Sequence, residues 1–214
     1  MKIKRIVLLM VIFIQGCSFF DHKENDNFAE IGSLKSENRW VYLCGLTQDF
    51  DSSQEIENRK KLDAIGCAQN IKFLAIKPNV RCSEFNNKLC WPHNNQDEVN
   101  NTYSYILSAL NNKKISGFIG FSNGGFFLNK LVQYVELNKP VISIGASGYL
   151  ENGSIKNKLF LLIGLQDTYH YKDAYEFYQR SKSMPLNVEF VEFNGGHEIP
   201  QLLFEETLRR LQER

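Results

Sequence analysis

The sequence predicts an α/β protein of three layers, in which helices cover both faces of a mostly parallel sheet of about six strands. After residue 39, short apolar runs alternate with segments of helical periodicity. The apolar runs are continuous, which is typical of strands buried on both faces. The 214 residues are enough for one domain with a sizeable core. Ligands of such sheets bind beyond the carboxyl ends of the strands.

Each expected element has its own local signal. Runs rich in branched and aromatic residues predict strands at 40–44, 71–76, 115–121, 141–144, 159–163 and 188–193. Apolar residues at helical spacing predict helices at 52–65, 96–110, 123–137, 171–181 and 199–211. Gly66 ends the first of these helices, and the loop at 79–95 carries two cysteines.

The first 16 residues have the layout of an export signal. Lys2, Lys4 and Arg5 precede an apolar run at 6–14, which is too short to span a bilayer as a helix. Ile14-Gln15-Gly16-Cys17 follows and resembles a bacterial lipobox, where the signal peptide is cut before a cysteine that is then lipid-modified. A plain signal peptide with an incidental cysteine is the alternative.

The lipobox resemblance implies a domain organisation and a location. We expect a signal peptide at 1–16, a polar tether at 17–38 that begins with lipidated Cys17, and a catalytic domain at 39–214. Acyl chains on Cys17 would anchor the protein in a membrane. The resemblance, with Ser18 after the cysteine, implies an exported lipoprotein in the outer membrane of a diderm bacterium.

Four further cysteines, an even number, favour disulfides in an exported chain. Cys82 and Cys90 bracket a short polar loop and form the preferred pair, which leaves Cys44 and Cys67 as the second pair. The sequence leaves all three connectivities open. A zinc site is not expected, because the chain has no Cys-x-x-Cys and no histidine at ligand spacing from these cysteines.

Gly120-Phe121-Ser122-Asn123-Gly124 stands between a predicted strand and a predicted helix. A serine nucleophile at such a turn has strained backbone angles and crowded neighbours, so the flanking positions require glycine. The N–H of Asn123, at the start of the helix, would face a developing oxyanion. The alternative is a glycine-rich loop with an incidental serine.

An acid and a histidine follow the next strands in the order that a triad requires. Asp167 comes after the strand at 159–163, and His197 comes after the strand at 188–193. His197 would take the proton of Ser122, and Asp167 would hold the imidazole in the right tautomer. Asp167 could instead be a plain helix cap, and His93 in the cysteine loop is the main competitor as an accessory residue.

Four segments in chain order resemble the α/β-hydrolase superfamily, most closely its phospholipase/carboxylesterase group, which includes acyl-protein thioesterases. The segments are Gly120-Phe121-Ser122-Asn123-Gly124-Gly125, Ser147-Gly148-Tyr149-Leu150, Gly164 with Asp167, and Gly195-Gly196-His197-Glu198-Ile199-Pro200. The resemblance implies an α/β-hydrolase fold. The first two strands of the larger fold are not expected here, because the tether at 17–38 is too polar and short. The resemblance also implies that the N–H of Leu46 is the second oxyanion donor.

The chain departs from this group at two places near the expected site. Cys44-Gly45-Leu46-Thr47-Gln48-Asp49 replaces the group's His-Gly-x-Gly-Asp, which changes the loop that carries Leu46. Thr168-Tyr169-His170 replaces an apolar residue followed by proline after Asp167. The second change alters the acyl or leaving-group pocket.

These observations predict a serine hydrolase that cleaves small carboxylic esters or thioesters through an acyl-enzyme on Ser122. No cofactor and no metal are expected, and a formal net charge of +1 gives no reason to expect nucleic acid as a partner. A peptidase or amidase on the same triad is one alternative. A non-catalytic lipoprotein that binds a ligand or partner is the other.

Overall fold

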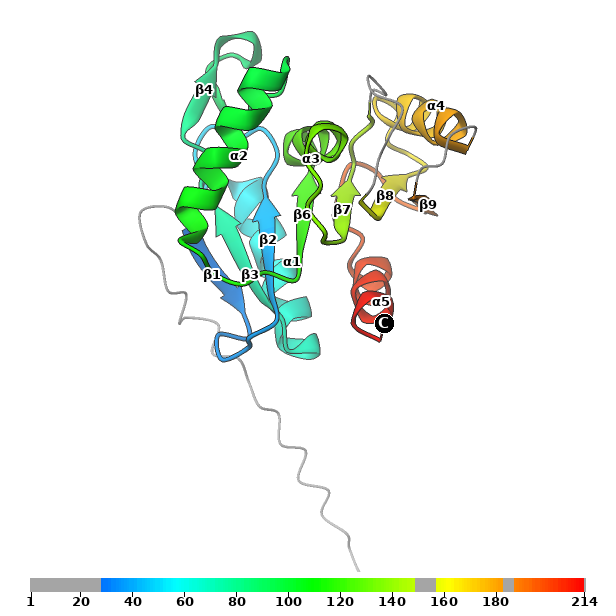
Figure 1. Cartoon of the computed structure of the whole chain (residues 1–214). Coiled ribbons are helices and arrows are strands. Elements are labelled where there is room, and N and C mark those ends of the chain that lie inside the picture. The colour runs from blue at the N-terminus through cyan, green and yellow to red at the C-terminus, as the bar shows by residue number, and fades with distance from the viewer. Residues whose placement is uncertain (1–27, 149–156, 183–186, 214) are drawn as a thin grey trace, which may run out of the picture.

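The computed structural model describes residues 28–148, 157–182 and 187–213, and a seven-stranded sheet forms its centre (Figure 1). The strand order is β1-β3-β2-β6-β7-β8-β9, and all neighbours are parallel except β1 and β3. The strands are β1 Phe28–Gly32, β2 Arg39–Leu43, β3 Lys72–Ile76, β6 Gly117–Phe121, β7 Val141–Ile144, β8 Leu159–Gly164 and β9 Val188–Phe193. The predicted α/β class and mostly parallel sheet are confirmed.

Five α-helices among the described residues complete the three layers. They are α1 Ser53–Gln69, α2 Gln96–Leu110, α3 Asn123–Tyr134, α4 Tyr171–Lys182 and α5 Gln201–Gln212. In Figure 1, α2 crosses in front of the sheet while α1 lies behind it. Helices α2 and α3 contact each other, α1 contacts α5, and α4 packs on β8 and β9. None of these helices has both the length and the apolar character that a membrane span needs.

The core follows from this layering. Every residue of β3, β6, β7 and β8 is buried, because helices cover both faces of these strands. The edge strand β9 is only half-buried, and it carries two charged residues, Glu189 and Glu192, among its apolar ones. The continuous apolar runs in the sequence therefore mark the centre of the sheet, and the run that charged residues interrupt marks its edge.

The tether predicted at 17–38 is wrong for its last part, because β1 lies within it. Phe28 and Ile31 are almost completely buried, and β1 pairs antiparallel with β3 at the edge of the sheet. Glu30 forms an ion pair with Lys72 at 3.4 Å. The strand has only five residues and polar neighbours, so the sequence lacks the continuous apolar run that predicted the other strands. The signal peptide at 1–16 and Cys17 lie outside the described residues, as do Tyr149 and Leu150.

Helix α1 is longer than predicted, because Gly66 does not end it. A Cβ on Gly66 would lie 2.7 Å from the Ile71 carbonyl oxygen and 2.8 Å from the Cα atom of Gly32. Glycine at this position lets α1 pack closely against β1. The chain turns at Asn70 instead, which adopts the left-handed conformation with a φ of 53°.

The cysteine loop forms a small hairpin. Its strands are β4 Val80–Cys82 and β5 Lys88–Cys90, joined by the short 3₁₀ helix η1 Ser83–Phe85. The predicted Cys82–Cys90 disulfide is present. The predicted Cys44–Cys67 pair is wrong, because Cys44 is a buried free thiol. Cys44 lies near Glu55 at the start of α1, whereas Cys67 is twelve residues further along the helix, roughly 18 Å away at 1.5 Å per residue.

Candidate active site

Ser122 occupies a strained turn between β6 and α3. Its φ is 51° and its ψ is −118°, a conformation that residues other than glycine rarely adopt. A Cβ on Gly120 would lie 2.4 Å from the Gly124 carbonyl oxygen, and one on Gly124 would lie 2.3 Å from the Leu43 carbonyl oxygen. Both positions therefore require glycine, as the sequence pattern predicts.

Backbone hydrogen bonds fix this turn to the ends of two neighbouring strands. The N–H of Ser122 donates at 2.9 Å to the carbonyl oxygen of Ile144, the last residue of β7. The N–H of Gly124 donates to the Cys44 carbonyl oxygen at 3.1 Å, after β2. The N–H of Asn123 lies between them, at the first position of α3, where helical N–H groups have no intrahelical acceptor.

Asp167 and His197 are brought together by two adjoining loops. The N–H of Gln166 donates to the Gly195 carbonyl oxygen at 2.9 Å, so the loop after β8 lies along the loop after β9. His197 Nδ1 then lies 2.7 Å from Asp167 Oδ2, and its N–H donates a hydrogen bond to the carboxylate. This contact leaves His197 Nε2 as the nitrogen that can act as a base.

Asp167 also bonds a second histidine, which the sequence did not single out as a site residue. His170 Nδ1 lies 2.9 Å from Asp167 Oδ1, and the ring centroids of His170 and His197 are 4.7 Å apart. The N–H of His170 donates to the same oxygen at 3.3 Å, so Asp167 both holds the turn before α4 and orients His197. In the sequence, the three-residue spacing between Asp167 and His170 was the feature that could have indicated this contact.

The charge on Asp167 is held in place by these partners. The carboxyl is almost completely buried, and burial alone would raise its pKa. The hydrogen bonds from His197 and His170 outweigh burial and lower the pKa of Asp167 below its usual value. Asp167 is therefore ionised at neutral pH, as the group that orients a catalytic imidazole must be.

Ser122 and His197 line one pocket of about 160 Å³, together with Leu46. His197 lies over the end of β7, since a Cβ on Gly145 would be 3.0 Å from its ring. Within the described residues, no hydrogen bond joins the Ser122 hydroxyl to His197. In free enzymes this contact is often long and tightens when substrate binds.

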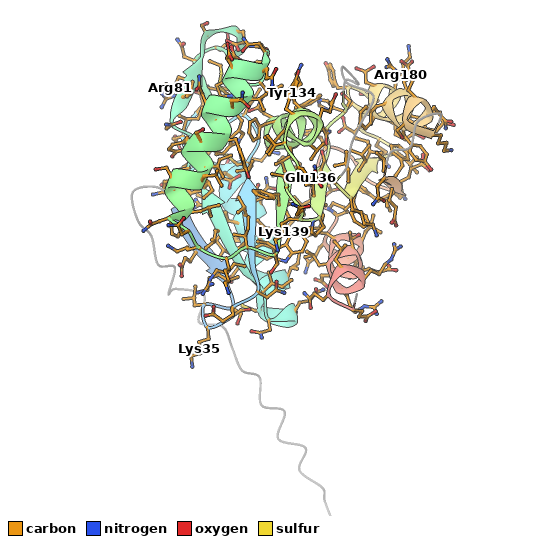
Figure 2. All side chains as sticks on the ribbon, viewed as in Figure 1. Lys35, Arg81, Tyr134, Glu136, Lys139 and Arg180 are labelled. Atoms are coloured by element: carbon orange, nitrogen blue, oxygen red, sulfur yellow. A yellow bond between two sulfur atoms is a disulfide. The ribbon has the colours of Figure 1, made fainter. Side chains whose placement is uncertain are left out.

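The loop that carries Leu46 is fixed by the disulfide hairpin. Thr47 and Leu89 exchange backbone hydrogen bonds, with the N–H of Leu89 donating at 2.7 Å and that of Thr47 at 3.3 Å. Arg81, labelled in Figure 2, donates to the Gln48 carbonyl oxygen at 3.0 Å. The hairpin thus supports the altered loop, a role that the sequence left open.

Trp91, directly after β5, links the same hairpin to the serine turn. Its indole N–H donates to the Cys44 carbonyl oxygen at 2.9 Å, and its backbone N–H donates to Asn123 Oδ1 at 2.7 Å.

His93 forms a hydrogen bond with the Trp91 carbonyl oxygen at 2.7 Å and stacks on Phe126. Burial lowers the pKa of His93. His93 therefore lies beside the site and does not replace His197.

Asp167, His170 and His197 are also the residues that could hold a metal ion, among those the structure describes. Their potential ligand atoms lie within 4.8 Å of one another. The Nδ1 atoms of both histidines already face the Asp167 carboxylate at hydrogen-bonding distance. This arrangement is that of an acid orienting imidazole rings, so we assign the cluster to proton transfer.

The chain belongs to the serine hydrolase (FSH1) family, because the model of that family matches residues 1–206. A search of curated proteins gave no match. Membership of the family agrees with the serine turn and the histidine–acid pair. The protein is therefore a serine hydrolase.

Solved structures share the fold at low sequence identity. The Mesorhizobium loti carboxylesterase has a TM-score of 0.64 at 12% identity, over 85% of this chain and 93% of that one. The Zea mays acyl-protein thioesterase 2 has a TM-score of 0.64 at 16% identity, over 87% and 97%. The Pyrococcus furiosus esterase Pf2001 has a TM-score of 0.61 at 17% identity, over 90% and 93%. These matches place the chain in the α/β-hydrolase fold.

Proposed function

We propose that this serine hydrolase cleaves carboxylic ester or thioester bonds through an acyl-enzyme on Ser122. The observation that carries the proposal is the shared pocket of Ser122 and His197, with His197 bonded to buried Asp167. The solved relatives named as carboxylesterase, esterase and thioesterase support this choice of bond at the level of the fold.

The reaction has two balanced halves. Ser122 Oγ attacks the carbonyl carbon while His197 Nε2 takes the hydroxyl proton, and the N–H groups of Asn123 and Leu46 stabilise the oxyanion. The tetrahedral intermediate collapses, and His197 gives its proton to the departing alcohol or thiol. Water then attacks the acyl-enzyme as His197 takes its proton, and the acid leaves as that proton returns to Ser122.

Labelling with a fluorophosphonate probe tests the nucleophile. We expect the probe to modify the wild-type protein and not Ser122→Ala, with circular dichroism unchanged. Ser104→Ala is the matched control, since Ser104 lies on the exposed side of α2 and bonds its own helix. A folded wild-type protein that takes no label would sink the proposal, and the alternative of a non-catalytic binding protein would replace it.

Matched substrates test the bond. We expect turnover of an ester and its thioester analogue to exceed that of the corresponding anilide by at least about a hundredfold, because the poorer amine leaving group needs more transition-state stabilisation. Equal turnover of the anilide would make the protein an amidase or peptidase on the same three residues.

We also propose that the protein is exported and anchored in a membrane through acylated Cys17. The lipobox-like Ile14-Gln15-Gly16-Cys17 supports this, and the outer membrane of a diderm bacterium is the expected location. Cys17→Ala should move the protein from the membrane fraction to the soluble fraction. Unchanged membrane association of this variant would contradict the proposal.

A further inference from the structure

The wall of the active-site pocket that α1 contributes is polar. Ser52, Gln54, Glu55 and Asn58 all line the pocket from the start of this helix, beside Thr47 of the neighbouring loop. Covering such groups with a hydrocarbon chain would leave their hydrogen bonds unmade, at a cost of roughly 1–3 kcal/mol for each buried group. A long fatty acyl chain is therefore a poor occupant of this wall.

Glu55 is the group in this wall with unused hydrogen-bonding capacity. Its side chain is only 3% exposed, and Tyr42 donates to Oε2 at 3.2 Å. Oε1 has no hydrogen-bond partner among the described residues. The nearest cation, Arg59, places its Nε atom 4.0 Å from that oxygen.

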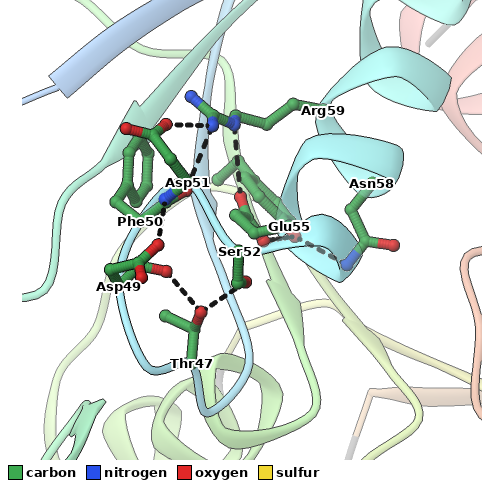
Figure 3. Close-up of polar contacts among 9 residues, drawn as sticks. Thr47, Asp49, Phe50, Asp51, Ser52, Glu55, Asn58 and Arg59 are labelled. Carbon is green, nitrogen blue, oxygen red and sulfur yellow. Dashed lines mark hydrogen bonds and ion pairs between the residues drawn. The ribbon is translucent and has the colours of Figure 1, made fainter.

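Arg59 divides its contacts between Glu55, through Nε, and the loop before α1, through Nη2 (Figure 3). Its Nη2 atom lies 2.6 Å from Asp51 and 3.0 Å from the Phe50 carbonyl oxygen, and its guanidinium stacks over the Phe50 ring at 4.5 Å. Arg59 therefore compensates the buried carboxyl only in part. Burial raises the pKa of Glu55 from 4.5 to about 8.

A neutral carboxyl both donates and accepts hydrogen bonds, whereas a carboxylate only accepts them. Glu55 in this state suits an uncharged hydroxyl of a ligand better than an ammonium group. The pocket is small, with a volume of about 160 Å³. A short, branched and hydroxylated fragment fits both the volume and the wall.

We propose that the α1 wall of the pocket, with Glu55 at its centre, binds a neutral hydroxyl group of the substrate close to the scissile carbonyl. The substrates are then short hydroxylated esters or thioesters rather than fatty acyl esters. The proposal rests on the proposed function, and it adds the specificity-determining residue and the substrate class.

Two pairs of esters test this on the full-length protein, each replacing one hydroxyl by a methyl group of similar size. The acyl pair is 4-nitrophenyl 3-hydroxybutanoate and 4-nitrophenyl 3-methylbutanoate. The alcohol pair is 2-hydroxypropyl acetate and 2-methylpropyl acetate. We expect kcat/KM to favour the hydroxylated member of at least one pair by about tenfold, which corresponds to one hydrogen bond to a buried group.

Variants of the wall assign the preference to residues. Glu55→Leu should abolish the preference, and Glu55→Gln should keep it because an amide also donates and accepts. Gln54→Leu, at an exposed position of the same wall, should weaken the preference for the hydroxylated ester. This second variant tests the wall if Glu55→Leu does not fold. Glu57→Gln is the matched control, since Glu57 lies on the same helix and pairs with Lys60 outside the pocket.

The outcomes separate this proposal from the proposed function. Preference for the methyl member in both pairs, or a preference that survives in both leucine variants, would overturn the polar wall. Fluorophosphonate labelling of Ser122 without hydrolysis of either pair would overturn the substrate class and leave the nucleophile in place. Absence of labelling would overturn both proposals.

Discussion

At the scale of single residues, Glu55 couples the stability of the fold to pH. Its pKa is about 8 in the folded protein against 4.5 for a glutamate in water, so the folded state keeps a proton that the unfolded chain releases. The stabilisation by that proton is complete below about pH 4.5 and is lost as pH rises through about 8. Burial raises the pKa values of two neighbours, Tyr42 and Cys44, well above their usual range, so both stay neutral over this pH range.

Glu55→Gln should remove this dependence. Between pH 6 and 8, the free energy of unfolding of the wild-type protein should fall by roughly 2–3 kcal/mol relative to the variant, at about 1.4 kcal/mol per pH unit. Urea unfolding at the two pH values measures the difference, with Glu57→Gln as the control. Parallel pH profiles for wild type and Glu55→Gln would contradict this, and would show that Glu55 is ionised throughout, with Arg59 compensating its charge.

The sequence could predict the residues whose chemistry follows from their place on a strand. Ser122, Asp167 and His197 each follow the carboxyl end of a parallel strand, so the order of the strands alone brings them to one edge. Glu55 and His170 are different, because their roles depend on burial and on which oxygen of a carboxylate each neighbour contacts. Neither quantity can be read from residue types and spacing.

At the scale of elements, the hairpin of β4 and β5 supports the loop that carries Leu46. Replacing both Cys82 and Cys90 by alanine should lower the free energy of unfolding by roughly 2–3 kcal/mol, as expected for a short disulfide loop. It should also slow fluorophosphonate labelling about tenfold, because Leu89 then holds Thr47 less firmly. Complete loss of one oxyanion donor lowers turnover by about 100- to 1000-fold. The expected effect is smaller, because the loosened loop still presents the N–H of Leu46 for part of the time.

The double variant is preferable to a reductant, since it leaves the other cysteines untouched. A labelling rate equal to that of the wild-type protein would make the hairpin a purely structural appendage.

The hairpin and β1 are also the elements that sequence periodicity missed. Strands of three and five residues, set among polar neighbours, do not produce a continuous apolar run, whereas the buried strands of the central sheet do.

At the scale of the whole molecule, β1 moves the start of the folded domain into the segment that the sequence assigned to a tether. Ile31 is 1% exposed and packs in the main core, so Ile31→Ala in the full-length protein should lower the free energy of unfolding by about 2–5 kcal/mol. Lys35→Ala is the control, because Lys35 projects from the lower end of the molecule in Figure 2 and is exposed. Urea unfolding measures the stability of both variants.

A tether would tolerate either change, so equal stability of the two variants would restore the boundary at residue 39. A loss confined to Ile31→Ala would show that β1 belongs to the folded domain, where it closes the edge of the sheet beside β3.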